Sequence, residues 1–209
     1  MIKKSITTTL AILFTIGLHA QISDLIISEY VEGSGNNRAI ELYNGTGNPV
    51  DLKNYRLERD LNGNGTFSYF YNLSGILEDK GIIVIGNPNA SAELIRKATT
   101  LHQAFTEFTG NDQIRLLKNG VEIDRIGIAG NINFAQNCTY VRVSTVTSPK
   151  SGEQNPKTNG EWTYFPNDSF NDLGIFFYAT NSFDFLYDDT GNRKRRKCVI
   201  LKSEAPEKQ

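Results

Sequence analysis

Residues 24–51, DLIISEYVEGSGNNRAIELYNGTGNPVD, decide the fold class of this chain. They contain two short runs rich in apolar residues, 25–30 and 39–43, separated by the loop GSGNNR and followed by NGTGNP. Short runs of this kind, bounded by Gly, Asn and Pro, are typical of β-strands joined by turns. Strand alternation predicts two faces for the first run, one with Ile26, Ser28 and Tyr30 and the other with Leu25, Ile27 and Glu29.

The same pattern continues to residue 178. Asn119-Gly120 gives the clearest hairpin signal, because this dipeptide is preferred in two-residue type I′ turns. One helix is predicted over residues 89–100, with Asn89 or Ser91 as its N-cap. At least seven short strands and a single helix favour an antiparallel β-sandwich. The further predicted strands are residues 55–60 and 66–73 (a hairpin around LNGNG), 82–85, 105–109, 112–126 (the Asn119-Gly120 hairpin) and 139–146.

The first twenty residues have the layout of a secretory signal peptide. Lys3 and Lys4 precede the apolar stretch 9–18, and the small residue Ala20 precedes Gln21. The apolar stretch is too short to span a bilayer. We therefore expect a secreted, periplasmic or cell-surface protein without a transmembrane anchor, whose mature chain begins at Gln21.

Charge divides the mature chain into two parts. Residues 21–178 contain 13 Lys and Arg against 18 Asp and Glu, a net charge of −5. Residues 179–209 are polar and basic, which predicts a flexible C-terminal tail. The basic run of this tail consists of Arg193, Lys194, Arg195, Arg196 and Lys197.

Seven short motifs follow one another in the order found in a known family. They are ISEY at residues 27–30, NNRAIELYN at 36–44, VDLKNYRL at 50–57, GIIVIGN at 81–87, NDQIRLLKNG at 111–120, IDRIG at 123–127 and EWTYFPNDSFNDLG at 161–174. Through them, residues 21–178 resemble the lamin tail domain, the immunoglobulin-like module of nuclear lamins that also occurs in exported bacterial proteins. The stretch YDDTGNR at 187–193 also resembles the start of a YD-type repeat of large surface proteins.

The resemblance implies an all-β, immunoglobulin-like sandwich with a binding or attachment role and no cofactor. We expect an exported, non-enzymatic binding or anchoring module, whose partner is a surface protein, a glycan or a nucleic acid. The alternative is an accessory DNA- or polysaccharide-binding subunit of a separately encoded nuclease or other hydrolase. A third hypothesis is a metal-dependent hydrolase that uses Glu29, Glu41 or the loop at Asp60.

Two groups of side chains are candidate ligand contacts. The rings of Phe67, Tyr69 and Tyr71 alternate along one predicted strand and would form a stacking platform for sugars or unpaired bases, while Phe70 would face the core. Packing on the sheet face is the structural alternative for these rings. The basic run of the tail would bind a polyanion, or simply serve as a solvated linker.

The other chemically notable residues have structural interpretations. Glu29 and Glu41 would accept hydrogen bonds from the backbone or from residues 36–38. Residues 60–65, DLNGNG, resemble the first half of a calcium loop, yet its twelfth position is Tyr71 and not Glu, which favours a plain turn.

Three single positions complete the candidate set. His102 is interpreted as a solvated surface residue, and Trp162 as a buried framework residue. Cys138 and Cys198 either form a disulfide or remain a buried thiol and a free thiol, and their spacing does not decide between the two.

Overall fold

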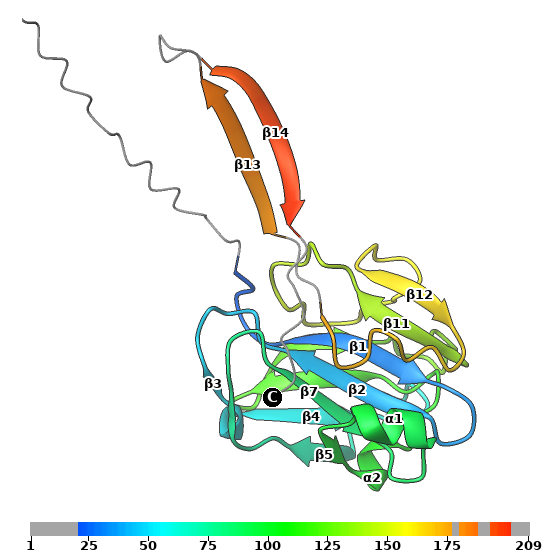
Figure 1. The fold of residues 1–209 in the computed structure, drawn as a ribbon. Helices are drawn as coiled ribbons and strands as arrows, with labels where there is room; N and C mark the ends of the chain where they lie inside the picture. The colour runs from blue at the N-terminus through cyan, green and yellow to red at the C-terminus, as the bar shows by residue number, and fades with distance from the viewer. Residues whose placement is uncertain (1–20, 177–179, 188–192, 202–209) are drawn as a thin grey trace, which may run out of the picture.

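Two β-sheets pack face to face in the computed structural model and form the body of the protein (Figure 1). The structure describes residues 21–176 together with the backbone of residues 180–187 and 193–201. The signal peptide prediction for residues 1–20 lies outside the described residues.

The larger sheet has six strands in the order β12-β11-β1-β2-β7-β8. Neighbouring strands are antiparallel except for β7 and β8, which are parallel. The predicted first pair is confirmed as β1 and β2. The strand bounds are β1 Ile26–Glu32, β2 Arg38–Tyr43, β7 Ile82–Gly86, β8 Thr100–Leu101, β11 Cys138–Arg142 and β12 Trp162–Pro166.

The smaller sheet has four antiparallel strands in the order β10-β9-β4-β5. A short two-stranded sheet and the 3-10 helix η1 (Leu52–Asn54) lie beside it. The antiparallel β-sandwich is therefore confirmed. The strand bounds are β3 Val50–Asp51, β4 Tyr55–Arg59, β5 Tyr69–Asn72, β6 Ile76–Leu77, β9 Ile114–Lys118 and β10 Val121–Ile126.

The hairpin between β9 and β10 turns at Asn119 and Gly120, as predicted. Their φ angles are 50° and 80°. A type I′ turn requires positive φ at both central residues, which Asn and Gly adopt more readily than other residues. The local sequence therefore fixes this connection.

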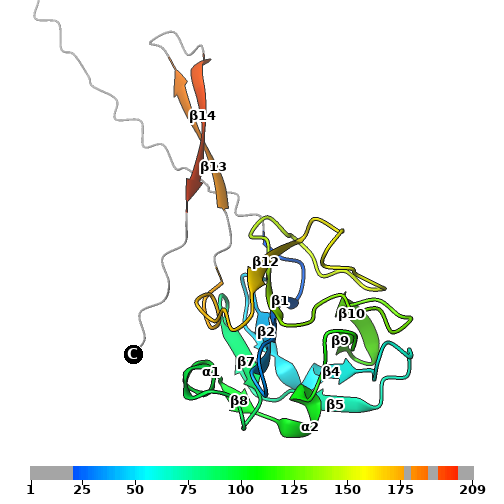
Figure 2. The same cartoon turned by 90° about the vertical axis from the view of Figure 1, so that its right-hand side faces the viewer.

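The main core lies between the two sheets and is closed at one edge by Trp162 of β12, which is buried as predicted. The opposite face of the six-stranded sheet is also covered. Figure 2 shows the sheet with the four-stranded sheet on one side and α1 (Ala92–Lys97) on the other. Phe170 and Leu173 pack with α1 on this outer face against Val31.

A β-bulge at Ser28 changes the predicted faces of β1. The register of β1 against β2 shifts between Ile27 and Glu29. Leu25 and Ile27 share the face toward the main core, whereas Glu29, predicted to lie with them, turns to the outer face. An extra residue in one strand reverses the alternation beyond it, so Ser28 shares the outer face with Ile26 as predicted, and the prediction was wrong from Glu29 onward.

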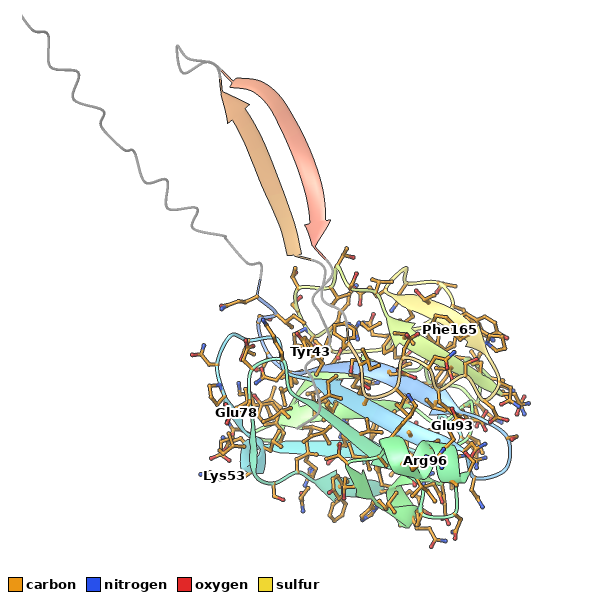
Figure 3. All side chains as sticks on the ribbon, in the orientation of Figure 1. Tyr43, Lys53, Glu78, Glu93, Arg96 and Phe165 are labelled. Carbon is orange, nitrogen blue, oxygen red and sulfur yellow. The ribbon has the colours of Figure 1, made fainter. Side chains whose placement is uncertain are left out.

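The helices differ from the sequence prediction. Helix α1 is shorter than predicted, and Ser91 caps it by accepting a hydrogen bond from Leu94 N. Figure 3 shows Glu93 and Arg96 on the solvent side of this helix. A second helix, α2 (Gln103–Thr106), stands where a strand was predicted for residues 105–109, because His102 Nδ1 accepts a hydrogen bond from Phe105 N and starts a helical turn.

The segment predicted as a flexible tail contains two strands, β13 (Thr180–Tyr187) and β14 (Arg193–Leu201). They pair with each other in antiparallel fashion and form a separate two-stranded sheet. Residues 180–187 and 193–201 therefore form a regular antiparallel strand pair within the segment predicted as a tail.

Candidate functional site

The surface of the four-stranded sheet that faces away from the core carries a row of charged and aromatic side chains. Leu57 and Leu116 point into the core, so the residues beside them on β4 and β9 point outward. We call this surface the arginine–aromatic face. It consists of Arg56, Glu58, Phe67, Phe70, Arg115, Glu122 and Arg125.

Ion pairs join the charged members across three strands. Glu58 of β4 contacts Arg56 on its own strand and Arg115 on β9, with 2.6 Å between Arg115 Nη2 and Glu58 Oε2. Glu122 of β10 lies 3.4 Å from Arg115 and 2.5 Å from Arg125. Each acid lies between two arginines, so the five side chains hold one another in place.

The pKa of the Glu122 carboxyl group reflects its position between two arginines. Burial raises the pKa of its carboxyl group, but hydrogen bonds from Arg125 and from Gly152 N, together with the charges of Arg125 and Arg115, outweigh burial. The net effect is a lowered pKa. Glu122 therefore stays ionised and anchors both arginines at neutral pH.

The two phenylalanine rings lie against arginines. The Phe67 ring centroid is 3.8 Å from Arg115 Cζ and 5.2 Å from Arg125 Cζ, and the Phe70 centroid is 5.6 Å from Arg56 Cζ. Such contacts between guanidinium groups and ring faces are attractive. Phe70 is 54% exposed and the Arg56 side chain 43% exposed, so this pair forms the part of the face most open to solvent.

The predicted stacking platform of Phe67, Tyr69 and Tyr71 is not formed. The Tyr69 ring lies 4.0 Å from Cζ of the buried Arg59, and Tyr71 packs against the main core. Phe70, predicted to face the core, is the exposed ring instead. Strand β5 begins only at Tyr69, so the period of two does not extend back to Phe67.

Sequence reasoning missed the three arginines of this face. A signal was present, because Arg56 and Arg115 alternate with apolar residues within predicted strands and so had to share the solvent side. Their meeting with Arg125 depends on the strand order β4-β9-β10, which no local pattern contains.

A second cluster lies on the outer face of the six-stranded sheet. Glu29 and Glu41 stand opposite each other on β1 and β2, and each is only 1% exposed. Glu41 accepts hydrogen bonds from Ser28 Oγ at 2.7 Å and from Gly174 N at 2.6 Å. Among the described residues, neither carboxyl oxygen of Glu29 has a hydrogen-bond partner.

The predicted backbone donor is present for Glu41, as Gly174 N, whereas the predicted side-chain donors Asn37 and Arg38 are engaged elsewhere. Asn37 Nδ2 donates to Asp168 Oδ1, and Arg38 pairs with Glu32. Burial is the main cause that raises the pKa of Glu29 to about 9 and that of Glu41 to about 7, and the charges of the neighbouring carboxylates add to both shifts. At neutral pH the pair therefore holds a proton.

The model of the Lamin Tail Domain matches residues 19–130, which is more than half of the 209 residues. The chain belongs to the lamin tail domain family. This is a family of immunoglobulin-like, non-catalytic domains, so the fold prediction is confirmed. No curated protein matches the chain.

The family model matches only the first part of this lamin tail domain, residues 19–130. The arginine–aromatic face and both glutamates fall within residues 19–130. Strands β11 and β12 and residues 168–176, which cover the glutamate pair, lie beyond it. In the part of the lamin tail domain that the structure describes, neither α1 nor α2 has the length and apolar character needed to cross a bilayer.

The loop at Asp60 has a structural role in the lamin tail domain. Its carboxylate accepts hydrogen bonds from Gln113 N at 2.6 Å, from Gln113 Nε2 at 2.8 Å and from Gly65 N at 3.0 Å. These bonds close the loop and tie it to β9. Across residues 21–176, no three His, Cys, Asp or Glu side chains gather in a group that could hold a metal ion.

The remaining candidates are placed as follows. His102 is partly exposed, packs its ring 4.9 Å from that of Tyr71 and caps α2, a structural role that the surface interpretation did not include. Cys138 is a buried free thiol, and burial raises its pKa to about 11. A free Cys138 means that the structure contains no disulfide at this residue, and the side chain of Cys198 lies outside the described residues. The side chains of Arg193, Lys194, Arg195, Arg196 and Lys197 also lie outside the described residues.

Proposed function

We propose that this protein is an exported, non-enzymatic module that binds or anchors to a protein partner through its arginine–aromatic face. The observation that carries the proposal is the solvent-open pair of Phe70 on the edge strand β5 and Arg56 on the neighbouring β4, held in place by the ion pairs behind it. Export rests on the signal-peptide layout of residues 1–20.

The composition of the face supports a protein partner. Aromatic residues and arginine are enriched at protein interfaces and dominate their energetic hot spots. The ion pairs also hold the arginines rigid before binding, which lowers the conformational entropy lost on association. Three arginines against two glutamates leave the face with a positive excess, which fits a partner surface of acidic character.

The alternative roles have weaker support. The positive excess of one charge is small for a polyanion such as DNA, which is usually bound by several unpaired cations. The rings that would have stacked on sugars or bases are engaged with arginines or the core. A non-catalytic role agrees with the family, and the polar groups of the Asp60 loop are engaged in closing that loop.

Site-specific photo-crosslinking tests the proposal. A photoreactive phenylalanine analogue is placed at Phe70 in one sample and at Glu93, on the other side of the sandwich, in another. Both are exposed to the outer-surface protein fraction of the host. We expect one discrete protein to crosslink from position 70 and not from position 93, and the yield to fall as salt rises.

Variants of the face give the quantitative control. With the crosslinked protein purified, Arg56→Ala and Phe70→Ala should each weaken binding about tenfold or more, as expected for hot-spot residues. Tyr164→Ala removes a comparably exposed ring on β12 and should bind as wild type does. Crosslinking from position 93 alone, or preferential retention of DNA or polysaccharide by the same chain, would contradict the proposal.

A further inference from the structure

Residues 168–176 cross the outer face of the six-stranded sheet and are fastened at several points, and we call them the covering segment. At its start, Asp168 accepts hydrogen bonds from Ser34 Oγ and Asn37 Nδ2. At its end, Phe176 packs its ring 4.6 Å from that of Tyr43. The chain then continues to β13, so the covering segment joins the sandwich to the C-terminal strands.

The middle of the covering segment is held by polar contacts to two charged side chains, the buried Glu41 and the partly exposed Lys97. Gly174 N donates to Glu41 Oε2 at 2.6 Å. Lys97 of α1 donates to the carbonyl oxygens of Leu173 at 3.1 Å and of Asn171 at 3.5 Å. The fastening to the sheet at this point therefore depends on the state of Glu41.

The hydrogen-bond pattern distinguishes the two glutamates. Glu41 accepts one hydrogen bond on each carboxyl oxygen, which is the pattern of an ionised carboxylate. Glu29 is buried and accepts none within the described part of the chain. A buried carboxylate without hydrogen bonds is strongly disfavoured, so Glu29 carries the proton.

We propose that Glu29 and Glu41 form a proton-dependent clasp that holds the covering segment on the sheet at neutral and acidic pH and releases it under alkaline conditions. With Glu29 protonated, a single negative charge on Glu41 faces Gly174 N. Loss of the proton places two buried negative charges opposite each other on β1 and β2, and the lowest-energy response is entry of water beneath the covering segment.

Other charged groups around Glu29 and Glu41 influence the pH at which the clasp opens. Asp172 on the covering segment adds a negative charge that raises the pKa of both glutamates, and Lys97 on α1 lowers both. Asp172 also lines a surface cavity of about 310 Å³ beside Ile175, Phe176 and Val141, the residue opposite Glu29 on β11. Because Val141 pairs with Glu29 and Asp172 acts on both glutamates, this cavity lies beside the pair.

The direction of the pH effect follows from linkage. Both pKa values are raised above the ordinary value of 4.5, to about 9 for Glu29 and about 7 for Glu41. The folded state therefore binds more protons than the unfolded state between pH 4.5 and 9. The stabilisation is complete below pH 4.5 and is lost as pH rises through the folded-state values, so the covering segment is weakest above pH 9.

Two measurements on the mature chain test the clasp. The amide signal of Gly174 in an NMR titration from pH 5 to 9.5 should shift with a midpoint well above 4.5, because its N–H donates to Glu41. Chymotrypsin cleavage within residues 168–176 reports release, since Phe170, Leu173 and Phe176 are buried in the closed form. Rates of variant and wild type are compared at the same pH, which cancels the pH dependence of the protease.

Glu29→Gln is the decisive variant, because glutamine keeps the shape and donor capacity of the protonated acid but cannot lose the proton. At pH 9 we expect wild type to be cleaved about tenfold faster than Glu29→Gln, the factor that corresponds to one pKa unit. At pH 6 the two rates should agree. Glu93→Gln, an exposed change on α1, should behave as wild type does at both pH values.

Ser28→Ala provides an independent check if Glu29→Gln folds poorly. It removes the hydroxyl that stabilises ionised Glu41, so the Gly174 midpoint should move to higher pH. A wild-type Gly174 signal that is flat from pH 5 to 9.5, equal cleavage of wild type and Glu29→Gln at pH 9, or a downward shift in Ser28→Ala would overturn the clasp.

Discussion

The guanidinium group of Arg142 on β11 lies 3.2 Å from the carboxylate of Asp124 on β10, and both side chains are completely buried. Asp124 also accepts hydrogen bonds from Ile27 N and Lys150 N, both at about 2.8–2.9 Å. One carboxylate therefore ties the four-stranded sheet to β1 and β11 of the six-stranded sheet. The bond to Ile27 N lies next to the bulge at Ser28.

Asp124→Ala should lower the free energy of unfolding by about 3–5 kcal/mol, because it removes the buried partner of Arg142 and leaves only the partly exposed Glu161 to balance its charge. Chemical denaturation measures the change. Glu161→Ala is the matched control, since Glu161 also pairs with Arg142 but is 23% exposed, and its loss should cost only about 1 kcal/mol. Equal losses in the two variants would show that burial of Asp124 is not the cause.

Trp162→Ala should cost about 3–5 kcal/mol, the usual range for a large buried aromatic ring. Trp162 is 7% exposed and closes the core at the edge strand β12. Tyr164, on the same strand, is 60% exposed, and Tyr164→Ala should cost less than about 1 kcal/mol. Thermal unfolding of both variants compares them, and a similar loss for each would mean that Trp162 is not part of the core.

Gly120→Ala should destabilise the protein by about 1 kcal/mol through backbone strain alone. Gly120 has a φ of 80°, and a Cβ built there meets no atom within 4 Å. Asn119→Gly is the control, because glycine adopts the φ of 50° at that position without strain. A neutral Gly120→Ala measured by denaturant unfolding would argue against the type I′ turn.

Features that depend on local sequence could be predicted from the chain. The Asn119-Gly120 turn, the pairing of β1 with β2 and the burial of Trp162 each follow from a short motif or from one apolar residue in its context. The resemblance over seven motifs supplied the fold, and the family match confirms it.

Features that depend on contacts between distant segments could not be predicted. The bulge at Ser28 lies beside a hydrogen bond to Asp124, 97 positions from Ile27 in the sequence. Glu41 accepts a hydrogen bond from Gly174 N, which lies 133 positions away in the sequence. The start of α2 at residue 103 depends on the His102 side chain. Residues 105–109 have the composition of a strand, so the sequence pattern did not predict this helix. These outcomes are set by tertiary packing, which overrides local preference.

The export prediction has a simple check. The mature protein should begin at Gln21, because the small residue Ala20 follows the apolar stretch of the signal peptide. Intact-mass analysis of protein collected outside the cytoplasm measures this. A soluble product that retains residues 1–20 would contradict the assignment.

We propose that this lamin tail domain works by binding a protein partner through its arginine–aromatic face. The most direct measurement is the calorimetric affinity of the protein crosslinked from position 70 for wild type, Phe70→Ala and Tyr164→Ala. The account predicts a loss of about tenfold or more for Phe70→Ala with an unchanged melting temperature, and wild-type affinity for Tyr164→Ala. Wild-type affinity for Phe70→Ala would contradict it.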